Sequence, residues 1–420
     1  MPKYYRRETY IERINKFRDE CELIKVLTGV RRCGKSTLLH IIEGDLITEK
    51  IGENNILFID LNKRPYKSVK TTDELEKIID NKFINVKGIK YLFIDEIQNV
   101  KGFESTIESY RLEGDYSIFI TGSNSYLLSG ELITKLTGRY IEFNINTLSF
   151  NEYICIKKFF KKDISSSYDE EFVKYILEGG FPLAVKYDDP IQKKDYILSI
   201  IDEIYKKDIK KNNKIRDKSL FNQVMTYVIN NFGSTTSVNN LCDYLEKVNG
   251  HRPSKHTIYS YLNILINAKI LTRCSRFDLK SKKSLGGDEK YYLSDLSFYY
   301  ATNADLRINY GPVLENICFN YFKDHGWAIS VGKIGKLEID FILSKPFNQG
   351  YAYVQVCKTL DNGIYDENGV CEVENREFRP LELIKDNYLK IVLTLDKLEK
   401  NRFGVASKNI ISLMLSNSSI

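Results

Sequence analysis

The stretch that decides the fold is "LTGVRRCGKSTLL", which runs from Leu27 to Leu39. From Gly29 it fits the pattern G-x-x-x-x-G-K-[S/T], which is typical of a phosphate-binding loop but also arises by chance. The context supports the pattern, because residues 22–28 are apolar and β-branched, as in a buried parallel strand. Residues 36–46 follow with apolar side chains at helical spacing. A strand, a glycine-rich loop and a helix therefore stand in the order that a phosphate site requires.

In this arrangement the loop amides surround a β-phosphate at the amino end of the helix, where the helix dipole favours an anion. Lys35 neutralises the β- and γ-phosphate oxygens, and the hydroxyl of Ser36 ligates Mg²⁺. The alternative is a glycine-rich turn that binds nothing, and a second motif further along the chain argues against it. The residues expected around the nucleotide are Gly29, Arg31, Arg32, Cys33, Gly34, Lys35, Ser36 and Thr37.

That second motif is "YLFIDEIQNV", residues 91–100, in which apolar residues lead to Asp95 and Glu96. Two carboxylates at the end of a buried strand are costly to desolvate without a compensating charge. Beside a phosphate-bound Mg²⁺ they have a role, since Asp95 accepts a metal-bound water and Glu96 polarises the attacking water as a general base. We therefore predict Ser36 and Asp95 as metal-site residues and Glu96 as a catalytic residue.

Two further segments carry catalytic candidates. Residues 116–125, "YSIFITGSNS", form another buried strand that ends in small polar residues. There Asn124 or Ser123 would orient the attacking water, and we favour Asn124. "LTGRY", residues 136–140, places Arg139 on a turn before the next strand. Arg139 is a candidate to meet a γ-phosphate in its own subunit or in a neighbouring one, and the alternative is a surface ion pair.

Together, "GVRRCGKSTLL", "FIDEIQNV", "ITGSNSYLL" and "LTGRY" resemble the prokaryotic AAA-type (P-loop) ATPases that carry a C-terminal nuclease-like domain of unknown function. "SFNEY", "GGFP", "KYYLSDL" and "GPVLENICFNYF" extend the resemblance over essentially the whole chain. The resemblance implies an ATPase core, a helical lid, a winged helix and a nuclease-like tail. Arg31 and Arg32 match a pair that is usual in this family, and contact with phosphate or with a partner subunit both stay open for them.

The fold class that follows is α/β. Apolar segments alternate with helical ones after a first helix at residues 7–19, which predicts a parallel sheet with helices on both faces. The expected strands lie near residues 23–28, 54–61, 91–94, 117–121 and 140–145. The expected parts are a P-loop AAA-type core at 1–146, a helical lid at 147–212, a winged-helix domain at 213–305 and a restriction-endonuclease-like α/β domain at 306–420.

In the third part, two amphipathic helices precede a hairpin with a basic tip, which is the order of a winged helix. Its second helix begins after a Ser cap and turns polar side chains outward. Such a face fits the major groove of duplex DNA, with the hairpin on the phosphate backbone. The alternative is a winged helix used for protein contacts or as a rigid hinge. The predicted DNA contacts are Lys255, Tyr259, Arg273, Arg276, Lys280, Lys282 and Lys283.

The fourth part has the layout of a nuclease-like metal site in which one position is lost. Glu315 on a helix and Asp340 on a strand occupy the first two positions. Gln355 stands where a second strand acid is expected, and Cys357 stands where a lysine is expected. Lys358 follows one residue late, on the opposite face of the strand. We therefore predict a vestigial site of Glu315, Asp340 and Gln355 that does not cut DNA, because it lacks the charge to hold a metal ion.

Composition narrows the class of protein further. The chain has 43% hydrophobic and 28% charged residues, which is ordinary for a globular protein. No apolar run approaches the roughly 18 residues of a membrane span, and the N-terminus has no apolar signal-peptide core, so we expect a cytoplasmic protein without a membrane partner. The net charge of +6 permits a nucleic-acid partner without demanding one.

The sequence predicts an ATP-hydrolysing AAA-type ATPase, with ATP and Mg²⁺ bound, that couples its nucleotide state to movement of the winged helix and the nuclease-like domain. Its expected partner is duplex DNA or another protein, and a homo-oligomer stays open. One alternative is an ATP-switched DNA-binding regulator with little turnover. A lesser alternative is an ATP-dependent nuclease.

Overall fold

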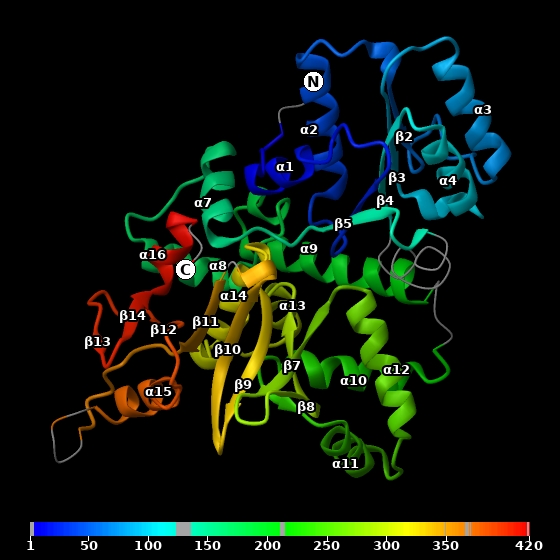
Figure 1. Ribbon diagram of the computed structural model, residues 1–420. Coiled ribbons are helices and arrows are strands. Elements are labelled where there is room, and N and C mark those ends of the chain that lie inside the picture. Colours follow the sequence, from blue (N-terminus) through cyan, green and yellow to red (C-terminus); the bar gives the residue numbers. More distant parts are fainter. Residues whose placement is uncertain are drawn as a thin grey trace. The chain divides into compact units, whose positions relative to one another are not determined.

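The computed structural model describes residues 4–122, 136–210, 215–348, 350–365, 369, 371–417 and 420 of the chain. Contacts between residues divide the chain into two units, which we describe separately (Figure 1). Unit 1 consists of Met1–Thr147, Asp202–Lys214 and Asn267–Lys269. Unit 2 consists of Leu148–Ile201, Ile215–Ile266 and Ile270–Ile420.

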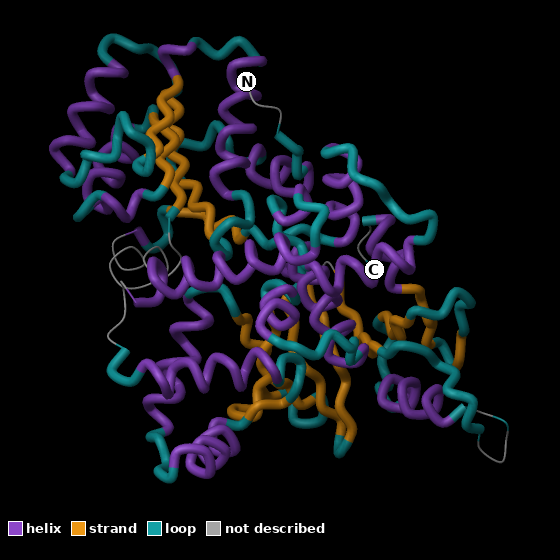
Figure 2. Tube along the Cα trace, turned by 180° about the vertical axis from the view of Figure 1, so that it is seen from behind, coloured by secondary structure: helices purple, strands orange, loops and turns teal. Residues whose placement is uncertain are grey.

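Unit 1 is built on a parallel sheet with the strand order β2-β3-β4-β1-β5. Figure 2, viewed from the opposite side, shows these strands side by side in orange with helices around them. The strands are β1 (Ile24–Thr28), β2 (Ile56–Asp60), β3 (Lys90–Asp95), β4 (Tyr116–Thr121) and β5 (Tyr140–Asn144). All five predicted strands are confirmed, and so is the α/β class of this part.

Helices cover both faces of this sheet, which explains why every residue of β1 and β4 is buried. On one face, apolar side chains of the strands pack against α3 and α4 in a single core. On the other face, Phe58, Phe93 and Phe119 stack on one another, and His40 of α2 stacks on Phe58 with ring centroids 4.1 Å apart. The helices are α1 (Glu8–Asn15), α2 (Lys35–Thr48), α3 (Thr72–Phe83) and α4 (Phe103–Glu113).

Unit 1 also includes a segment from much later in the chain. Helix α9 (Pro190–Glu203) continues directly into a π-helix, η4 (Ile204–Lys210). Ile204 and Ile209 are buried there, so the segment is anchored by apolar contacts. A π-helical turn is rare and frequently occurs at functional sites.

Unit 2 contains a nine-stranded sheet with the order β13-β14-β12-β11-β10-β9-β7-β8-β6. The sheet runs without interruption across the boundary expected at residue 305, because β7 pairs in parallel with β9. The strands are β6 (Thr235–Thr236), β7 (Leu271–Asp278), β8 (Lys283–Leu293), β9 (Ala328–Ile334), β10 (Leu337–Lys345), β11 (Gly350–Val356), β12 (Leu389–Thr394), β13 (Asn401–Arg402) and β14 (Val405–Asn409).

The helices of unit 2 pack at several places around this sheet. The segment expected as a lid contributes α7 and α8, which contact each other and α16, while α8 also contacts α13. The helices are α7 (Phe150–Phe159), α8 (Tyr168–Glu178), α10 (Lys218–Asn230), α11 (Val238–Asn249), α12 (Lys255–Asn267), α13 (Ser297–Thr302), α14 (Tyr310–Asp324), α15 (Glu372–Glu382) and α16 (Ile410–Ser416). Among the described residues, no helix is both long enough and apolar enough to cross a membrane.

Two sequence motifs that lie far apart in the chain meet inside unit 2. The amide of Gly180, in "GGFP", donates a hydrogen bond of 2.8 Å to the carboxylate of Asp295, in "KYYLSDL". A Cβ atom on Gly179 would lie 2.0 Å from that carboxylate, and Gly179 has a φ of 77°. The close approach therefore requires glycine at this position.

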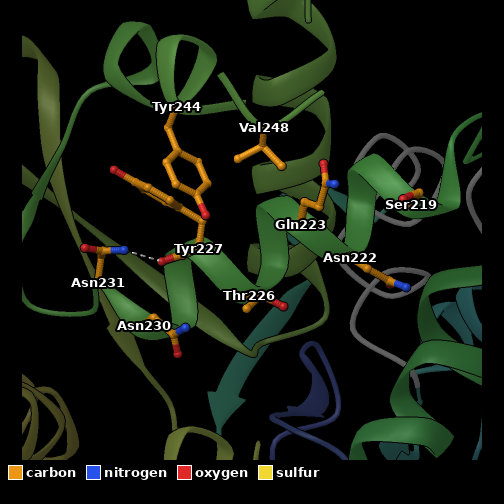
Figure 3. A pocket seen from close by; sticks show the side chains of 9 residues that line it. All are labelled: Ser219, Asn222, Gln223, Thr226, Tyr227, Asn230, Asn231, Tyr244 and Val248. Atoms are coloured by element: carbon orange, nitrogen blue, oxygen red, sulfur yellow. Dashed lines mark hydrogen bonds between the residues drawn. The ribbon is translucent and has the colours of Figure 1, made fainter. Parts of the chain in front are cut away.

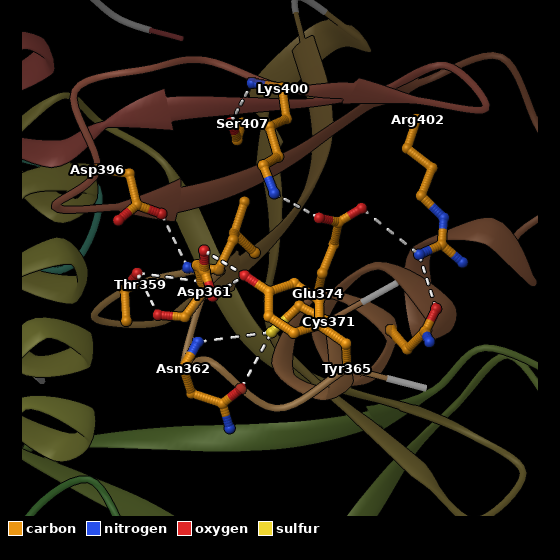
Figure 4. Close-up of polar contacts among 12 residues, drawn as sticks. Thr359, Asp361, Asn362, Tyr365, Cys371, Glu374, Asp396, Lys400, Arg402 and Ser407 are labelled. Atoms are coloured by element: carbon orange, nitrogen blue, oxygen red, sulfur yellow. Dashed lines mark hydrogen bonds and ion pairs between the residues drawn. The ribbon is translucent and has the colours of Figure 1, made fainter. Parts of the chain in front are cut away.

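Polar contacts secure the far end of the sheet (Figure 4). The thiol of Cys371, which precedes α15, lies 3.0 Å from Oδ1 of Asn362. Lys400 pairs with Glu374 of α15 at 2.5 Å, and this links the helix to the segment that leads into β13. Strands β13 and β14 and helix α16, which follow β12, were not predicted.

Candidate nucleotide-binding site

The loop between β1 and α2 turns sharply and brings the chain to the amino end of α2. Gly29, Arg32 and Gly34 all have left-handed φ values, of 138°, 69° and 109°. A Cβ atom on Gly29 would lie 2.0 Å from the carbonyl oxygen of Ile145, so no side chain fits there. Gly34 caps α2 without a side-chain hydrogen bond to the helix, and its φ favours glycine although the space around it is open.

The lysine of the loop lies over the loop backbone. Nζ of Lys35 donates hydrogen bonds to the carbonyl oxygens of Gly29, at 2.8 Å, and Val30, at 3.2 Å. This places an ammonium group beside the amino end of α2, where a phosphate is also favoured by the helix dipole. Cys33 is fully buried, so its side chain packs inside the unit, whereas Thr37 is half-buried in the first turn of α2.

Asp95 and Ser36, the two residues predicted to hold a metal ion, lie close to each other. The buried carboxylate of Asp95 accepts a hydrogen bond from the hydroxyl of Thr121, and the hydroxyl of Ser36 is near enough to lower its pKa. Asp60 on β2 lies beside Asp95 in the sheet register and adds a second negative charge. Burial raises the pKa of Asp95, although both hydroxyls act in the opposite direction. A hydroxyl and two carboxylates form a set of hard oxygen donors that suits Mg²⁺.

Glu96, the predicted base, is held by two residues that the sequence analysis did not select. Its φ is 61°, a strained conformation for a non-glycine residue and one that clusters at functional sites. Its amide donates a hydrogen bond of 3.2 Å to the Thr121 hydroxyl, and Gln98 Nε2 donates one of 2.5 Å to its carboxylate. Thr121 therefore contacts both acidic residues. Thr121 could have been selected from the sequence, because it ends the strand next to β3, at the same edge of the sheet as Asp95.

Arg31 and Arg32 lie in the loop, but their side chains contact the segment that follows α9. Nε and Nη2 of Arg31 lie 3.1 and 3.2 Å from the two carboxylate oxygens of Asp208. Arg32 donates to Glu203 at 3.2 Å. Burial lowers the pKa of Arg31, but Asp208, Glu96 and Glu203 outweigh burial and raise it overall.

Arg139 is not brought to this loop. Its carbonyl accepts a hydrogen bond from the amide of Ile24, where β1 begins, whereas the loop leaves the other end of β1. Five residues at about 3.3 Å each put roughly 16 Å between these two edges of the sheet. Nη1 of Arg139 instead lies 2.8 Å from the carboxylate of Glu108. This position argues against action of Arg139 on the γ-phosphate of its own subunit, and action on a neighbouring subunit stays a prediction.

Asn124 and Ser123, the candidates for orienting the attacking water, lie outside the described residues. The other predicted members of the nucleotide site belong to unit 1. Gly29, Gly34, Lys35 and Ser36 come from one loop and the start of one helix, and Asp95 joins them through Ser36.

A second charged cluster lies in unit 2, where the vestigial site was predicted. The carbonyl oxygen of the Gln355 side chain accepts a hydrogen bond of 3.3 Å from the amide of Asp340, and the Asp340 carboxylate accepts one of 2.8 Å from the amide of Val356. The carboxylate of Glu315 accepts a hydrogen bond of 3.2 Å from the Tyr292 hydroxyl. Each of the three predicted residues thus accepts a hydrogen bond from another group of the protein.

A lysine that was not predicted supplies the positive charge of this cluster. Lys290 of β8 is 4% exposed, and its Nζ lies 2.9 Å from Glu315 and 2.8 Å from Glu338. Burial lowers the pKa of Lys290, but Glu315, Asp340 and Glu338 raise it overall, so the ammonium stays charged. Lys358 points elsewhere, with its Nζ over the ring of Tyr310 at 4.4 Å.

The predicted DNA contacts fall into three groups. Lys255 and Tyr259 are exposed on α12 and help to line a hollow of about 300 Å³ beside β8. Lys280, Lys282 and Lys283 are exposed around the β7–β8 turn, and β8 begins at Lys283. The two arginines of β7 are already paired: Arg273 lies 3.6 Å from Glu289, and the mostly buried Arg276 lies 3.6 Å from Glu338.

A larger groove of about 530 Å³ lies between α10 and α11 (Figure 3). Tyr227 and Tyr244 line it with ring centroids 5.0 Å apart, and amide side chains such as Asn222 and Gln223 face it as well. No residue that lines it is charged, so this groove offers no ion pair to a phosphate.

Comparison with known proteins agrees with the site in unit 1. Residues 22–154 match the family model AAA_14, described as an AAA domain, and residues 169–307 match DUF8612, a domain of unknown function. A Haemophilus influenzae protein named "Uncharacterized protein" is 33% identical over 391 residues, which are 92% of this chain and 92% of that protein. "Uncharacterized protein MJ1544" of Methanocaldococcus jannaschii is 29% identical over 384 residues, or 89% of this chain and 82% of that protein.

The chain is also similar to solved structures. The Walker-type ATPase PABY2304 of Pyrococcus abyssi is 16% identical, with a TM-score of 0.48 over 73% of this chain and 96% of that one. The Orc1 protein of Aeropyrum pernix, solved in complex with DNA, is 11% identical, with a TM-score of 0.31 over 72% of this chain and 93% of that one.

The parallel sheet, the loop between β1 and α2, and the acidic end of β3 define a protein of the P-loop class with an AAA domain. The chain belongs to the same family as the Haemophilus influenzae protein, with which it aligns over almost its full length.

Proposed function

We propose that this protein binds ATP with Mg²⁺ at the loop between β1 and α2 and hydrolyses it. The observation that carries the proposal is the proximity of the Ser36 hydroxyl to the buried carboxylate of Asp95, whose pKa it lowers. This proximity brings the helix that receives the phosphates next to the strand that carries the predicted base. A buried acidic group with Asp60 beside it has little structural purpose unless a cation is bound near it.

Each part of the site has a chemical role in this proposal. The amides at the amino end of α2 bind the phosphates, and Lys35 neutralises their oxygens. Mg²⁺ held through Ser36 and Asp95 supplies further charge neutralisation. Glu96 takes a proton from the attacking water, while Thr121 and Gln98 fix its backbone and its carboxylate.

Equilibrium binding of ATP tests the site itself. We expect the wild type to bind ATP and the Lys35→Ala protein to lose binding, because the loop loses its phosphate-neutralising ammonium. Lys87→Ala, which removes an exposed lysine elsewhere in unit 1, should bind as the wild type does. Equal ATP affinity of Lys35→Ala and wild type would contradict the proposed site.

We further propose that residues 218–293 form a winged helix that binds duplex DNA or a protein partner, and that nucleotide state controls it. The element order α10-β6-α11-α12-β7-β8, with β6 paired to β8, supports this assignment. The exposed lysines on α12 and at the β7–β8 turn support a polyanionic partner.

For residues 306–420 we propose a restriction-endonuclease-like domain that serves as a binding platform and does not cut DNA. The supporting observation is that Lys290 pairs with Glu315 and also lowers the pKa of Asp340, which burial raises, so an ammonium already lies beside these acids. A divalent cation would meet that ammonium at short range. Incubation with supercoiled plasmid and Mg²⁺ or Mn²⁺ tests this. Cleavage by the wild type that disappears in Asp340→Asn would overturn it.

A further inference from the structure

Arg31 belongs to the phosphate-binding loop, and its guanidinium contacts Asp208, a residue 177 positions further along the chain. Nε and Nη2 contact the two oxygens of Asp208 separately, at 3.1 and 3.2 Å. The two side chains are 14% and 9% exposed, so water screens the pair only weakly. A two-point contact of this kind matches the fixed fork of a guanidinium, and the same fork fits a phosphate.

Arg31 lies near other carboxylates besides Asp208. Its Nη1 lies 3.6 Å from the carboxylate of Glu203, and Glu96 also contributes to its raised pKa. Arg32 and Lys207 both contact Glu203, at 3.2 and 2.6 Å. Arg31 is thus a cation of the loop that contacts Asp208 at two points and that also interacts with Glu96.

Asp208 belongs to the π-helix η4, which follows α9 and precedes the point at Ile215 where the chain re-enters unit 2. The side chains of Lys206 and Lys207 in the same segment are largely exposed, whereas Asp208 and Ile209 are buried. Release of Asp208 by Arg31 therefore removes a two-point contact between the loop and η4.

We propose that Arg31 recognises the terminal phosphate of ATP and leaves Asp208 to do so. ADP lacks the γ-phosphate, and the Arg31–Asp208 pair stays intact when ADP is bound. This inference rests on the proposed function and extends it. It names the residue that distinguishes ATP from ADP and the segment, η4, that responds to the difference.

The affinities of ATP and ADP in three full-length proteins test the proposal. Asp208→Asn removes the competing negative charge, and we expect ATP to bind about fivefold or more tightly than in the wild type, while ADP affinity stays nearly unchanged. Asp202→Asn is the matched control, because it removes the same charge from the same segment but from a carboxylate that pairs with the exposed Lys206. It should change neither affinity.

Arg31→Gln supplies the converse measurement, which also serves if Asp208→Asn does not fold. This substitution should lower the affinity for ATP and leave the affinity for ADP nearly unchanged. Hydrogen exchange at residues 204–210 should be faster with ATP than with ADP in the wild type. The proposal is overturned if Arg31→Gln or Asp208→Asn shifts ATP and ADP equally, or shifts neither, in a protein whose wild type binds ATP. Absence of ATP binding by the wild type would instead overturn the proposed function.

Discussion

Arg139 and Glu108 form an ion pair of 2.8 Å at the edge of the sheet where β1 begins. The loop that is expected to bind ATP leaves the opposite end of the same strand. The pair therefore fixes Arg139 beyond the reach of its own nucleotide site. An arginine placed in this way can act on a phosphate only if that phosphate belongs to a neighbouring subunit.

We expect Arg139→Ala to lose ATP hydrolysis and to regain part of it when mixed with Lys35→Ala. In a mixed oligomer, some interfaces pair an intact loop with an intact arginine. Arg111→Ala is the control, since Arg111 also pairs with Glu108 at 2.8 Å and should affect stability rather than turnover. If Arg139→Ala hydrolyses ATP as fast as the wild type, the Arg139–Glu108 ion pair has a structural role only.

Gln98 is expected to position Glu96. Gln98→Ala removes the hydrogen bond to the carboxylate, and we expect turnover to fall by about tenfold with little change in ATP affinity, because orientation is lost and binding is not. Gln98→Glu replaces the amide donor with a second carboxylate beside Glu96, so turnover should fall at least as far. Wild-type turnover in Gln98→Glu would show that the two side chains are not coupled during turnover.

Charge reversal separates the DNA candidates. Replacing Lys255, Lys280, Lys282 and Lys283 by Glu should weaken binding to duplex DNA and flatten its salt dependence, because the slope follows the number of phosphates neutralised. Arg276→Glu should have a smaller effect on that slope, since Arg276 is mostly buried and faces Glu338. Both can be measured by fluorescence anisotropy over a series of salt concentrations. No DNA affinity of the wild type at low salt would favour a protein partner.

Lys25 should make stability depend on pH. It is fully buried in β1, with its Nζ bonded to the Glu20 carbonyl at 2.5 Å and the Ser117 hydroxyl at 2.9 Å. Burial lowers its pKa from 10.5 to about 8. Below pH 8 both folded and unfolded states hold the proton, and the folded state bears the cost of a buried charge. As the pH rises above 8, only the unfolded state keeps the proton, so the free energy of unfolding increases.

The comparison with Lys25→Met isolates this contribution. Between pH 7 and pH 10, the free energy of unfolding of the wild type should rise by about 2 kcal/mol relative to Lys25→Met. Urea denaturation at several pH values measures the difference. Parallel pH dependence of the two proteins would mean that Lys25 is not desolvated in the folded state.

The sequence was sufficient for those features that are written in contiguous residues. The five strands of unit 1 are short apolar runs, and the loop from Gly29 to Ser36 carries its own conformational signal in its glycines. The acidic end of β3 could be assigned because Asp95 and Glu96 follow an apolar run directly. Each of these depends on local chemistry, and the structure has them where they were expected.

Features that depend on contacts between distant residues could not be predicted in the same way. Lys290 joins Glu315 only because β8 runs alongside the C-terminal sheet, and the parallel pairing of β7 with β9 that continues this sheet has no local signal. The position of Arg139 required the register of β5 against β1, since a motif gives order along the chain but not the edge of the sheet. Arg31 and Asp208 meet across 177 residues for the same reason.

Steady-state ATP turnover by wild type and Glu96→Gln tests the central claim most directly. The substitution keeps the size and the hydrogen-bonding capacity of the side chain but removes the group that takes the proton from water. We predict that Glu96→Gln binds ATP as tightly as the wild type and hydrolyses it at least about a hundredfold more slowly. Equal turnover by the two proteins would contradict the assignment of Glu96 as the base and, with it, the proposed mechanism of hydrolysis.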